Sequence, residues 1–355
     1  MKFLGRKKKI KILVTHELFP PSFSGGGEIF VLKLVELLSN RKDTEVSVVT
    51  TSCGGCREIV NKKNVRIKRI NINRYLFNIF SIPRLLAESK RHDIIITNTY
   101  NAAIPSLIAA KINKKPIICF VHGAYHKKWF KMRSPILAFV SIIFEKILFN
   151  LPFDKLIFLS NYARKYAIRI SNVIRSRGIV LHPGVDYTRF MPLKKKKQVL
   201  FIGRFEKQKG INTAIDVAYK MSNVKFVFIG RGRIDRKLPD NIKRYTFVPE
   251  KVLRRIYGES LIFMLPSVAE ALGFVVLEAM ASGCVIVSTV PLEYNGCFIE
   301  DNTKVDEFVR CIKKYLDNYH SSVKLGRKNR EIVIKKYSWD KFIESLYRVI
   351  MKLLK

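Results

Sequence analysis

Two short segments of the chain combine glycines with charged side chains in a way that suits anion binding. Gly26 and Gly27 precede Glu28 and a run with helical apolar spacing, and Arg204 and Lys209 lie between two further glycines. Glycines at a helix start let backbone N–H groups approach an anion, and a helix N-terminus favours negative charge. The glycine segment matches neither a dinucleotide fingerprint nor a Walker loop, so a plain flexible turn remains an alternative there. The basic segment is equally open to being a solvated loop.

A third segment carries two carboxylates. Glu270 and Glu278 are eight residues apart, which on one helix separates them by about 80° around the axis. We therefore expect Glu270 in a loop and Glu278 on a helix that starts at Gly273 and Phe274, whose amides would point towards a ligand. The alternative is purely structural: one of the two carboxylates would stabilise the N-terminal end of the helix dipole, and the other would be an exposed glutamate without a function.

Each of these segments follows a short apolar run typical of a buried strand and precedes a helical period. Strand, loop, helix and strand recur along the chain in two series, separated by the charged segment 192–197. This order predicts an α/β fold with two Rossmann-like, doubly wound parallel sheets. Ligand loops leave such sheets at the carboxyl ends of the strands, so two facing domains would line a cleft with them.

Length and composition agree with two folded domains that act on anions. The chain has 355 residues, of which 48% are hydrophobic, and this excludes a disordered or fibrous protein. Its net charge of +38 indicates nucleic acid, an acidic membrane surface or phosphorylated substrates as partners. A coding bias towards lysine would have the same effect on the charge.

Six cysteines are too few for a disulfide scaffold in a chain of this length. Cys53 and Cys56 have the spacing of a metal or redox pair, but no second pair or nearby histidine accompanies them. The start of the chain lacks the apolar stretch of a signal peptide, and the apolar run 136–149 is shorter than the ~20 residues that span a bilayer. We expect a cytoplasmic protein, with peripheral binding to the cytosolic face of a membrane left open.

Six segments, in order, resemble the family 4 glycosyltransferases, which have the GT-B fold. The segments are Gly25–Glu28; Val121-His122-Gly123; Pro183–Asp186 with Phe190 and Pro192; Gly203-Arg204 with Lys209-Gly210; Pro266-Ser267 with Glu270, Glu278 and 279–283; and Tyr337-Ser338-Trp339. The resemblance spans most of the chain. Six matches in the same order make it specific.

The resemblance implies a domain plan and a reaction. Residues 1–192 would form the acceptor-side domain, residues 198–336 the nucleotide-sugar-binding domain, and residues 337–355 a helix that crosses back to the first domain. The enzyme would be a hexosyltransferase-type glycosyltransferase that moves a sugar from a nucleoside-diphosphate sugar to an acceptor hydroxyl. Retention of configuration, by front-face attack assisted by the leaving phosphate, is also implied.

The resemblance also assigns roles to the residues. His122 and Glu270 would be catalytic, and the donor-binding residues would be Gly26, Gly27, Arg204, Lys209, Gly273, Phe274 and Glu278. Positive side chains and a helix N-terminus can stabilise a leaving diphosphate without a metal. Because the chain has no Asp-x-Asp pair, we expect no metal and no other cofactor.

The chain departs from the family pattern near the donor site. Val285 stands where proline is usual, and the segment 288–296 is about ten residues short and lacks the common Gly-Gly-x-x-Glu sequence. Arg231 and His182 are also atypical. These differences leave the nucleotide base and the donor sugar open.

A basic and aromatic segment precedes the longest apolar run. Lys127, Lys128, Lys131 and Arg133 surround Trp129-Phe130, just before the helix expected over 135–149. This arrangement fits a membrane surface that presents a glycan or lipid-linked glycan acceptor, and it fits equally a packed core helix beside solvated lysines.

Two other functions remain open on the sequence alone. One is a catalytically impaired GT-B scaffold that binds polyanions, although no nucleic-acid motif occurs and we expect no nucleic acid as partner. The other is a nucleotide-sugar 2-epimerase. The acceptor, the linkage and the oligomeric state stay open as well.

Overall fold

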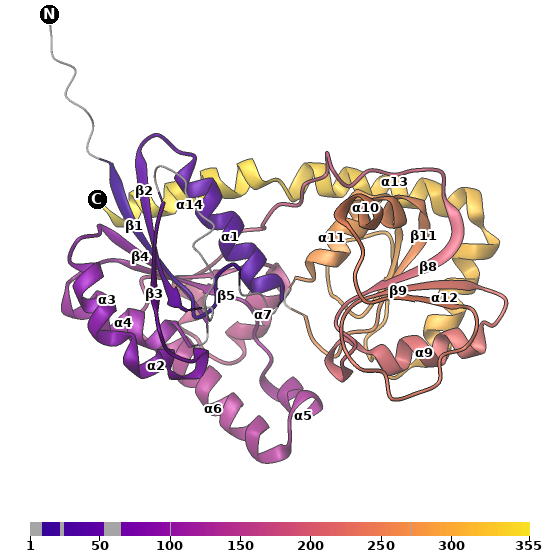
Figure 1. The fold of residues 1–355 in the computed structure, drawn as a ribbon, viewed down its shortest axis with the longest axis horizontal. Helices are drawn as coiled ribbons and strands as arrows, with labels where there is room; N and C mark the ends of the chain where they lie inside the picture. The colour runs from indigo at the N-terminus through magenta and orange to yellow at the C-terminus, as the bar shows by residue number, and fades with distance from the viewer. Residues whose placement is uncertain (1–8, 22–24, 53–64, 100, 271) are drawn as a thin grey trace, which may run out of the picture. The chain divides into compact units, whose positions relative to one another are not determined.

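A computed structural model describes residues 9–21, 25–52, 65–99, 101–270 and 272–355 (Figure 1). The chain divides into two compact units. Unit 1 consists of residues 1–124, 144–181 and 343–355, and unit 2 consists of residues 125–143 and 182–342. The pair Cys53 and Cys56 lies outside the described residues.

Unit 1 is built on a seven-stranded sheet with the order β3-β2-β1-β4-β5-β6-β7. Its strands are β1 (Ile10–Thr15), β2 (Thr44–Thr51), β3 (Val65–Ile70), β4 (Ile94–Asn98), β5 (Ile117–Val121), β6 (Lys155–Phe158) and β7 (Gly178–Val180). Every pairing between these strands is parallel. The central strands read as continuous apolar runs because helices cover both of their faces.

The helices of unit 1 connect these strands. They are α1 (Gly26–Ser39), the 3-10 turn η1 (Arg74–Leu76), α2 (Phe77–Phe80), α3 (Ile82–Ser89), α4 (Ala103–Ile112), α7 (Asn161–Ile168) and α8 (Ile174–Arg177). Helices α6 (Pro135–Asn150) and α14 (Trp339–Leu353) have residues in both units. From Ile343 onwards α14 belongs to unit 1, where Tyr347 donates to Asp43 Oδ2 at 2.6 Å and Arg41 lies over the Tyr347 ring.

Unit 2 contains a six-stranded sheet with the order β10-β9-β8-β11-β12-β13. Its strands are β8 (Lys196–Ile202), β9 (Lys225–Ile229), β10 (Ile242–Tyr245), β11 (Ser260–Leu265), β12 (Val285–Ser288) and β13 (Gly296–Phe298), all paired in parallel. Its helical segments are η2 (His126–Lys128), α5 (Trp129–Met132), η3 (Lys207–Lys209), α9 (Ile211–Lys220), α10 (Glu250–Glu259), α11 (Phe274–Ala281), α12 (Val305–Asp317) and α13 (Tyr319–Lys336).

Both sheets have the doubly wound strand order, so the predicted fold class is confirmed. The direction of winding reverses between β1 and β4 in unit 1 and between β8 and β11 in unit 2. Ligands bind such sheets at the reversal, beyond the carboxyl ends of the strands. The loops after β1, β4, β8 and β11 are therefore the places to look for a site.

The shortened segment of the sequence forms a direct link between two neighbouring strands. β12 and β13 pair in parallel, and only residues 289–295 connect them. A Cβ on Gly296 would come to 1.8 Å from the carbonyl oxygen of Ile286, so the two strands approach closely at that point. The short segment 289–295 therefore joins two neighbouring strands without interrupting the sheet.

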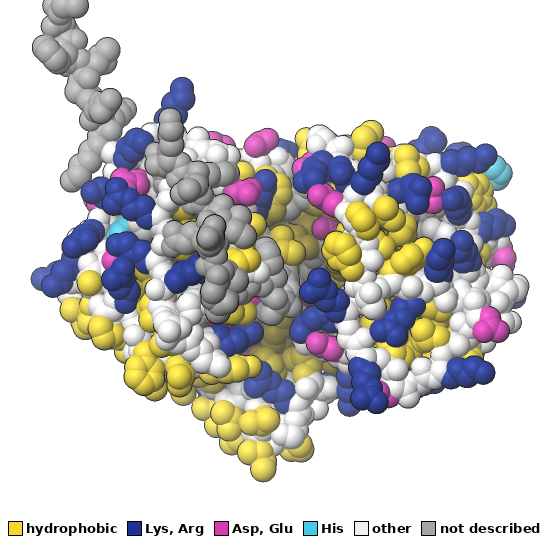
Figure 2. Space-filling view, in the orientation of Figure 1, with side chains coloured by type: hydrophobic (Ala, Val, Ile, Leu, Met, Phe, Trp, Pro, Cys, Tyr) yellow, Lys and Arg dark blue, Asp and Glu magenta, His cyan; other side chains and the backbone are white. Residues whose placement is uncertain are grey.

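Lysine and arginine side chains are spread over the visible surface of each unit (Figure 2). One lysine of the charged segment is an exception, since Lys195 is only 7% exposed. Its Nζ donates to the carbonyl oxygens of Tyr257, Ser260 and Ser282, at 3.5, 2.9 and 2.6 Å. Burial lowers the pKa of Lys195. This residue is therefore part of the core of unit 2.

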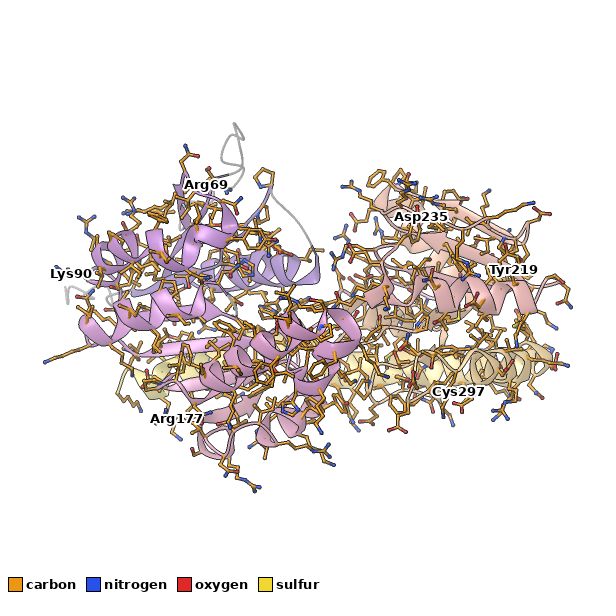
Figure 3. All side chains as sticks on the ribbon, turned by 90° about the horizontal axis from the view of Figure 1, so that it is seen from below. Arg69, Lys90, Arg177, Tyr219, Asp235 and Cys297 are labelled. Carbon is orange, nitrogen blue, oxygen red and sulfur yellow. A yellow bond between two sulfur atoms is a disulfide. The ribbon has the colours of Figure 1, made fainter. Side chains whose placement is uncertain are left out.

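Cys297 in β13 forms a disulfide with Cys311 in α12, and Figure 3 shows Cys297 beside the C-terminal helices of unit 2. The cysteine count did not predict this pair. Cys119 and Cys284 are buried free thiols. No helix in the described part of the chain has both the length and the apolar character needed to cross a membrane.

Candidate active site

Two loops of unit 2 that are distant in the sequence lie against each other. The loop after β8 ends at Gly210, which has a φ of +73°, and a Cβ there would come to 1.8 Å from the carbonyl oxygen of Pro266. Only glycine fits this position. The backbone N–H of Val268 donates to the carbonyl of Gln208 at 2.9 Å. The loops after β8 and β11 thus form one surface at the reversal of the sheet.

Lys209 and Glu270 face each other across these loops. Lys209 Nζ donates to Glu270 Oε1, which also accepts from Ser267 Oγ at 3.3 Å. The two side chains are 21% and 13% exposed, so their pair is shielded more than a surface pair. From the family resemblance, Lys209 was expected to bind the donor and Glu270 to be catalytic. The structure joins them directly, so a phosphate bound at Lys209 would compete with Glu270.

Arg204 lies in the same loop but is more exposed. Its Nη1 donates to Glu206 Oε1 at 3.1 Å, and both side chains are exposed. Exposed pairs of this kind contribute about 0–1 kcal/mol and are readily exchanged for another anion. A hydrogen bond of 2.7 Å from the Phe205 N–H to the Arg231 carbonyl fixes the backbone of this loop.

Helix α11 starts immediately after the Glu270 loop. Gly273 has a φ of +70° and precedes the first helical residue, Phe274. The first amides of a helix have no partner within it and form the positive end of its dipole. The Phe274 ring stacks on Trp339, with centroids 6.4 Å apart and planes at 18°. Glu270 therefore lies in a loop and Glu278 on the helix, as predicted.

Glu278 is held by a residue that the sequence did not point to. The hydroxyl of Tyr257, on α10, donates to Glu278 Oε2 at 2.8 Å. Burial raises the pKa of Glu278 to about 7, and the hydrogen bond from Tyr257 acts in the opposite direction. The pKa of the buried Tyr257 is itself raised well above its ordinary value, first by burial and then by the nearby carboxylate. Glu278 can thus change charge near neutral pH.

In unit 1, the glycine segment forms the start of α1. The helix begins at Gly26, and Glu28 Oε2 accepts a hydrogen bond of 2.8 Å from the N–H of Gly25. Gly27 lies beside His122, because a Cβ on Gly27 would be 3.9 Å from His122 Nδ1. The predicted anion-binding turn and the predicted histidine therefore meet in space.

The protonation of His122 follows from its contacts. Its Nε2 lies 2.7 Å from Asn98 Oδ1, and the Asn98 amide nitrogen donates to the carbonyl of Thr15 at 3.1 Å. Nε2 is therefore the protonated nitrogen, and Nδ1 is left as an acceptor beside Gly27. Burial, together with the electrostatic effect of the neighbouring His16, lowers the pKa of His122 to about 3. The ring is neutral throughout the physiological pH range.

A second histidine belongs to the same cluster and was not predicted. The rings of His16 and His122 lie edge to face, with centroids 6.2 Å apart. The N–H of Leu18 donates to His16 Nδ1 at 3.1 Å. The signal that could have found His16 is its place directly after β1, in a loop that the strand order marks for ligands.

The predicted site residues thus form two groups, one in each unit. The group in unit 1 is Gly26, Gly27 and His122, and the group in unit 2 is Arg204, Lys209, Glu270, Gly273, Phe274 and Glu278. Among the residues that the structure describes, no three His, Cys, Asp or Glu side chains gather as they would around a metal ion.

Both halves of the chain match family models. Residues 24–189 match the model described as Glycosyltransferase Family 4, and residues 189–332 match the model described as Glycosyl transferases group 1. The chain is 26% identical to an uncharacterized glycosyltransferase of Methanocaldococcus jannaschii, over 97% of this chain and 99% of the relative. It is also 26% identical to the processive diacylglycerol alpha-glucosyltransferase of Acholeplasma laidlawii, over 69% and 82% of the two chains.

A solved structure shows the same fold. HepE of Anabaena, in complex with UDP and glucose, superposes with a TM-score of 0.77 at 16% identity, over 96% of this chain and 99% of that chain. The two family models follow each other along the chain and meet at residue 189, close to the start of the second sheet. The chain therefore belongs to the group 1, family 4 type of glycosyltransferases and has the GT-B fold.

Proposed function

We propose that the protein transfers a glycosyl group from a nucleoside-diphosphate sugar to an acceptor hydroxyl. The observation that carries this proposal is the pairing of Lys209 with Glu270 at the reversal of the second sheet, next to the start of α11. A cation and a helix N-terminus suit the diphosphate, and a displaced carboxylate suits sugar hydroxyls. The complex of HepE with UDP and glucose supports a donor of this class.

Each residue would contribute through charge or hydrogen bonding. As the bond between the anomeric carbon and the diphosphate oxygen breaks, charge develops on the leaving phosphate. Lys209, Arg204 and the amides of Gly273 and Phe274 would stabilise that charge, so the reaction needs no metal or other cofactor. Glu270, released from Lys209, would accept hydrogen bonds from the sugar.

The remaining groups would orient the donor. Glu278 in its ionised form would accept hydrogen bonds from the ribose hydroxyls, as acidic residues do in other nucleotide sites. Neutral His122 would accept a hydrogen bond from a donor hydroxyl at Nδ1, beside Gly26 and Gly27. The acceptor oxygen would attack from the face of the leaving group and pass its proton to the departing phosphate, which retains the anomeric configuration.

The acceptor we propose is a glycan or a lipid-linked glycan at the cytosolic face of a membrane. The name of the Acholeplasma relative supports a lipid as acceptor. The exposed apolar surface of α6 in this chain supports the same idea.

A donor screen tests the proposal. UDP-, GDP- and ADP-sugars are incubated with the purified protein, and release of the nucleoside diphosphate is measured together with binding. We expect donors with one nucleotide base to bind most tightly and Lys209→Ala to weaken binding of that donor. Lys207→Ala, on the same short helical turn, is expected to leave the binding unchanged. Absence of binding to every donor would overturn the proposal. Conversion of a donor into its 2-epimer without transfer would favour an epimerase, and binding of polyanions without turnover would favour an impaired scaffold.

A further inference from the structure

Helix α6 presents an apolar stripe to solvent instead of to the core. The exposed side chains recur at helical spacing along one face, and they are Ile136, Phe139, Val140, Ile143 and Ile147. Ile136 is 78% exposed and Phe139 is 59% exposed. From Ile136 to Ile147 the stripe is about 17 Å long. Figure 2 shows hydrophobic side chains gathered over this helix, at the lower edge of the view.

The opposite face of α6 is the one that packs. Ala138, Leu148 and Phe149 are fully buried, and so is the single acidic residue of the helix, Glu145. The helix is therefore already attached to the protein through one face. Its second apolar face is additional, and such a face is costly in water unless it is covered.

The exposed charged residues of the segment 125–150 are all basic, and one of them, Lys131, is paired with Asp301 at 3.1 Å. Lys127, Lys128, Lys131 and Arg133 precede α6, and exposed Lys146 lies beside the stripe on the helix itself. In the segment 125–150 the only acidic residue is the buried Glu145. Two copies that met through this stripe would bring their lysines together, whereas a negatively charged surface would neutralise them.

We propose that the stripe of α6 lies in the interface of an anionic lipid bilayer, with its apolar side chains among the acyl chains and the flanking lysines at the headgroups. A helix of this kind lies in the membrane plane and sinks about 5–10 Å into the boundary region. Basic residues beside it add attraction to acidic lipids within a Debye length of the surface. The inference deepens the proposed function, on which it rests, by naming the surface that meets a membrane-bound acceptor.

Flotation with vesicles tests the inference. The full-length protein is mixed at physiological salt with vesicles of phosphatidylglycerol and phosphatidylethanolamine, or of phosphatidylcholine alone. We expect the wild-type protein to float with the anionic vesicles and to bind the neutral ones at least tenfold more weakly. The variant Ile136→Ser/Phe139→Ser/Ile143→Ser is expected to lose at least tenfold in partitioning, because each buried apolar side chain contributes about a factor of ten.

Further variants test the contribution of the positive charges and the dependence on position in the protein. Lys127→Glu/Lys146→Glu is expected to lose at least tenfold on anionic vesicles and little on neutral ones. Ile112→Ser, at a residue that is 63% exposed at the end of α4, is the apolar control. Lys328→Glu/Lys335→Glu, on the exposed side of α13, is the charge control. Both controls are expected to float like the wild-type protein.

Three results would overturn the inference: no flotation of the wild-type protein, equal flotation of the stripe variant, or equal losses in the controls. A wild-type dimer that the stripe variant converts into a monomer, measured by sedimentation, would assign the face to self-association instead. Donor binding is measured on the same preparations. A protein that binds the donor but no vesicles contradicts only the membrane inference. A protein that binds vesicles but none of the donors contradicts only the proposed function.

Discussion

The hydroxyl of Tyr257 donates a hydrogen bond of 2.8 Å to Glu278 Oε2, between two consecutive helices of unit 2. The bond favours the ionised carboxylate, while burial favours the neutral acid and has the larger effect, so the pKa of Glu278 rises to about 7. The residue proposed to bind the ribose is thus set to change its charge near neutral pH.

Replacing Glu278 by glutamine is expected to change how stability depends on pH. The folded protein keeps a proton on Glu278 between its ordinary pKa of 4.5 and about 7, and the unfolded chain loses it. The free energy of unfolding of the wild type therefore falls as pH rises through this window. The free energy of unfolding of Glu278→Gln does not fall in this way, so between pH 5 and pH 8 it should rise by about 1–3 kcal/mol relative to that of the wild type. Urea unfolding of both proteins at pH 5 and pH 8 measures the difference in their free energies of unfolding. A difference that does not change with pH contradicts the raised pKa of Glu278.

Removing the hydroxyl of Tyr257 is expected to shift donor binding along the pH axis. The hydrogen bond lowers the pKa of Glu278, so Tyr257→Phe raises that pKa further. If ionised Glu278 binds the ribose, donor affinity rises with pH, and its midpoint should move upward in the variant. Calorimetric titration with the preferred donor from pH 6 to 9 measures the midpoint. A midpoint that stays in place would show that Glu278 does not carry the pH dependence.

The pairing of Lys209 with Glu270 predicts opposite effects on nucleotide binding. Lys209→Ala should weaken binding of the nucleoside diphosphate about 10- to 100-fold, because it removes a charged hydrogen bond. Glu270→Gln removes the competitor for Lys209, so the diphosphate should bind at least as tightly as to wild type. Turnover of the sugar donor by Glu270→Gln should nevertheless fall at least tenfold. Weaker binding of the bare diphosphate by Glu270→Gln would contradict the proposed competition.

The neutral ring of His122 predicts a flat pH response. Because the pKa of His122 is lowered to about 3, its ionisation should cause no change in kcat/KM between pH 5 and pH 8. His122→Ala should lower kcat/KM about 10- to 100-fold and leave binding of the bare diphosphate unchanged. Asn98→Ala should lose part of this activity, since Asn98 fixes the tautomer. A pH limb that disappears in His122→Ala would show a charged histidine in the reaction.

Gly210 is expected to tolerate no side chain. Its φ is +73°, and a Cβ would meet the Pro266 carbonyl at 1.8 Å. Gly210→Ala should therefore destabilise the protein by at least about 2 kcal/mol in urea unfolding. Gly203→Ala in the same loop is the control, because its Cβ would find ordinary contacts from 3.5 Å. Equal stability of the two variants would contradict the close approach.

The sequence predicts those parts of the fold that depend on local patterns. Continuous apolar runs predict the buried strands β1 and β11, and the glycines that follow indicate the loops of the candidate site. β13 was not predicted, since it has three residues and no apolar run. Lys195 belongs to the charged segment 192–197, and nothing in that run of lysines distinguishes it from its neighbours. It is buried because three carbonyl groups from separate elements meet around its ammonium group.

Contacts between distant residues explain what else was missed in the candidate site. His16 and His122 are 106 positions apart, and only the pairing of β1, β4 and β5 brings them together. Tyr257 reaches Glu278 because α10 packs on α11, and no local pattern around Tyr257 indicates a ligand site. Residue types and spacing thus locate the loops. The hydrogen-bond partners that tune each side chain depend on packing.

The hydrogen bond from Val268 to Gln208 and the close approach of Gly210 to Pro266 join the loops after β8 and β11 into one structural unit. Substitutions on the two loops should then be thermodynamically coupled. In a double-mutant cycle on donor binding, Lys209→Ala and Glu270→Gln should deviate from additivity by more than about 0.5 kcal/mol. Natural variants of this enzyme would therefore change these two loops together, and a change of donor preference would seldom arise from one loop alone.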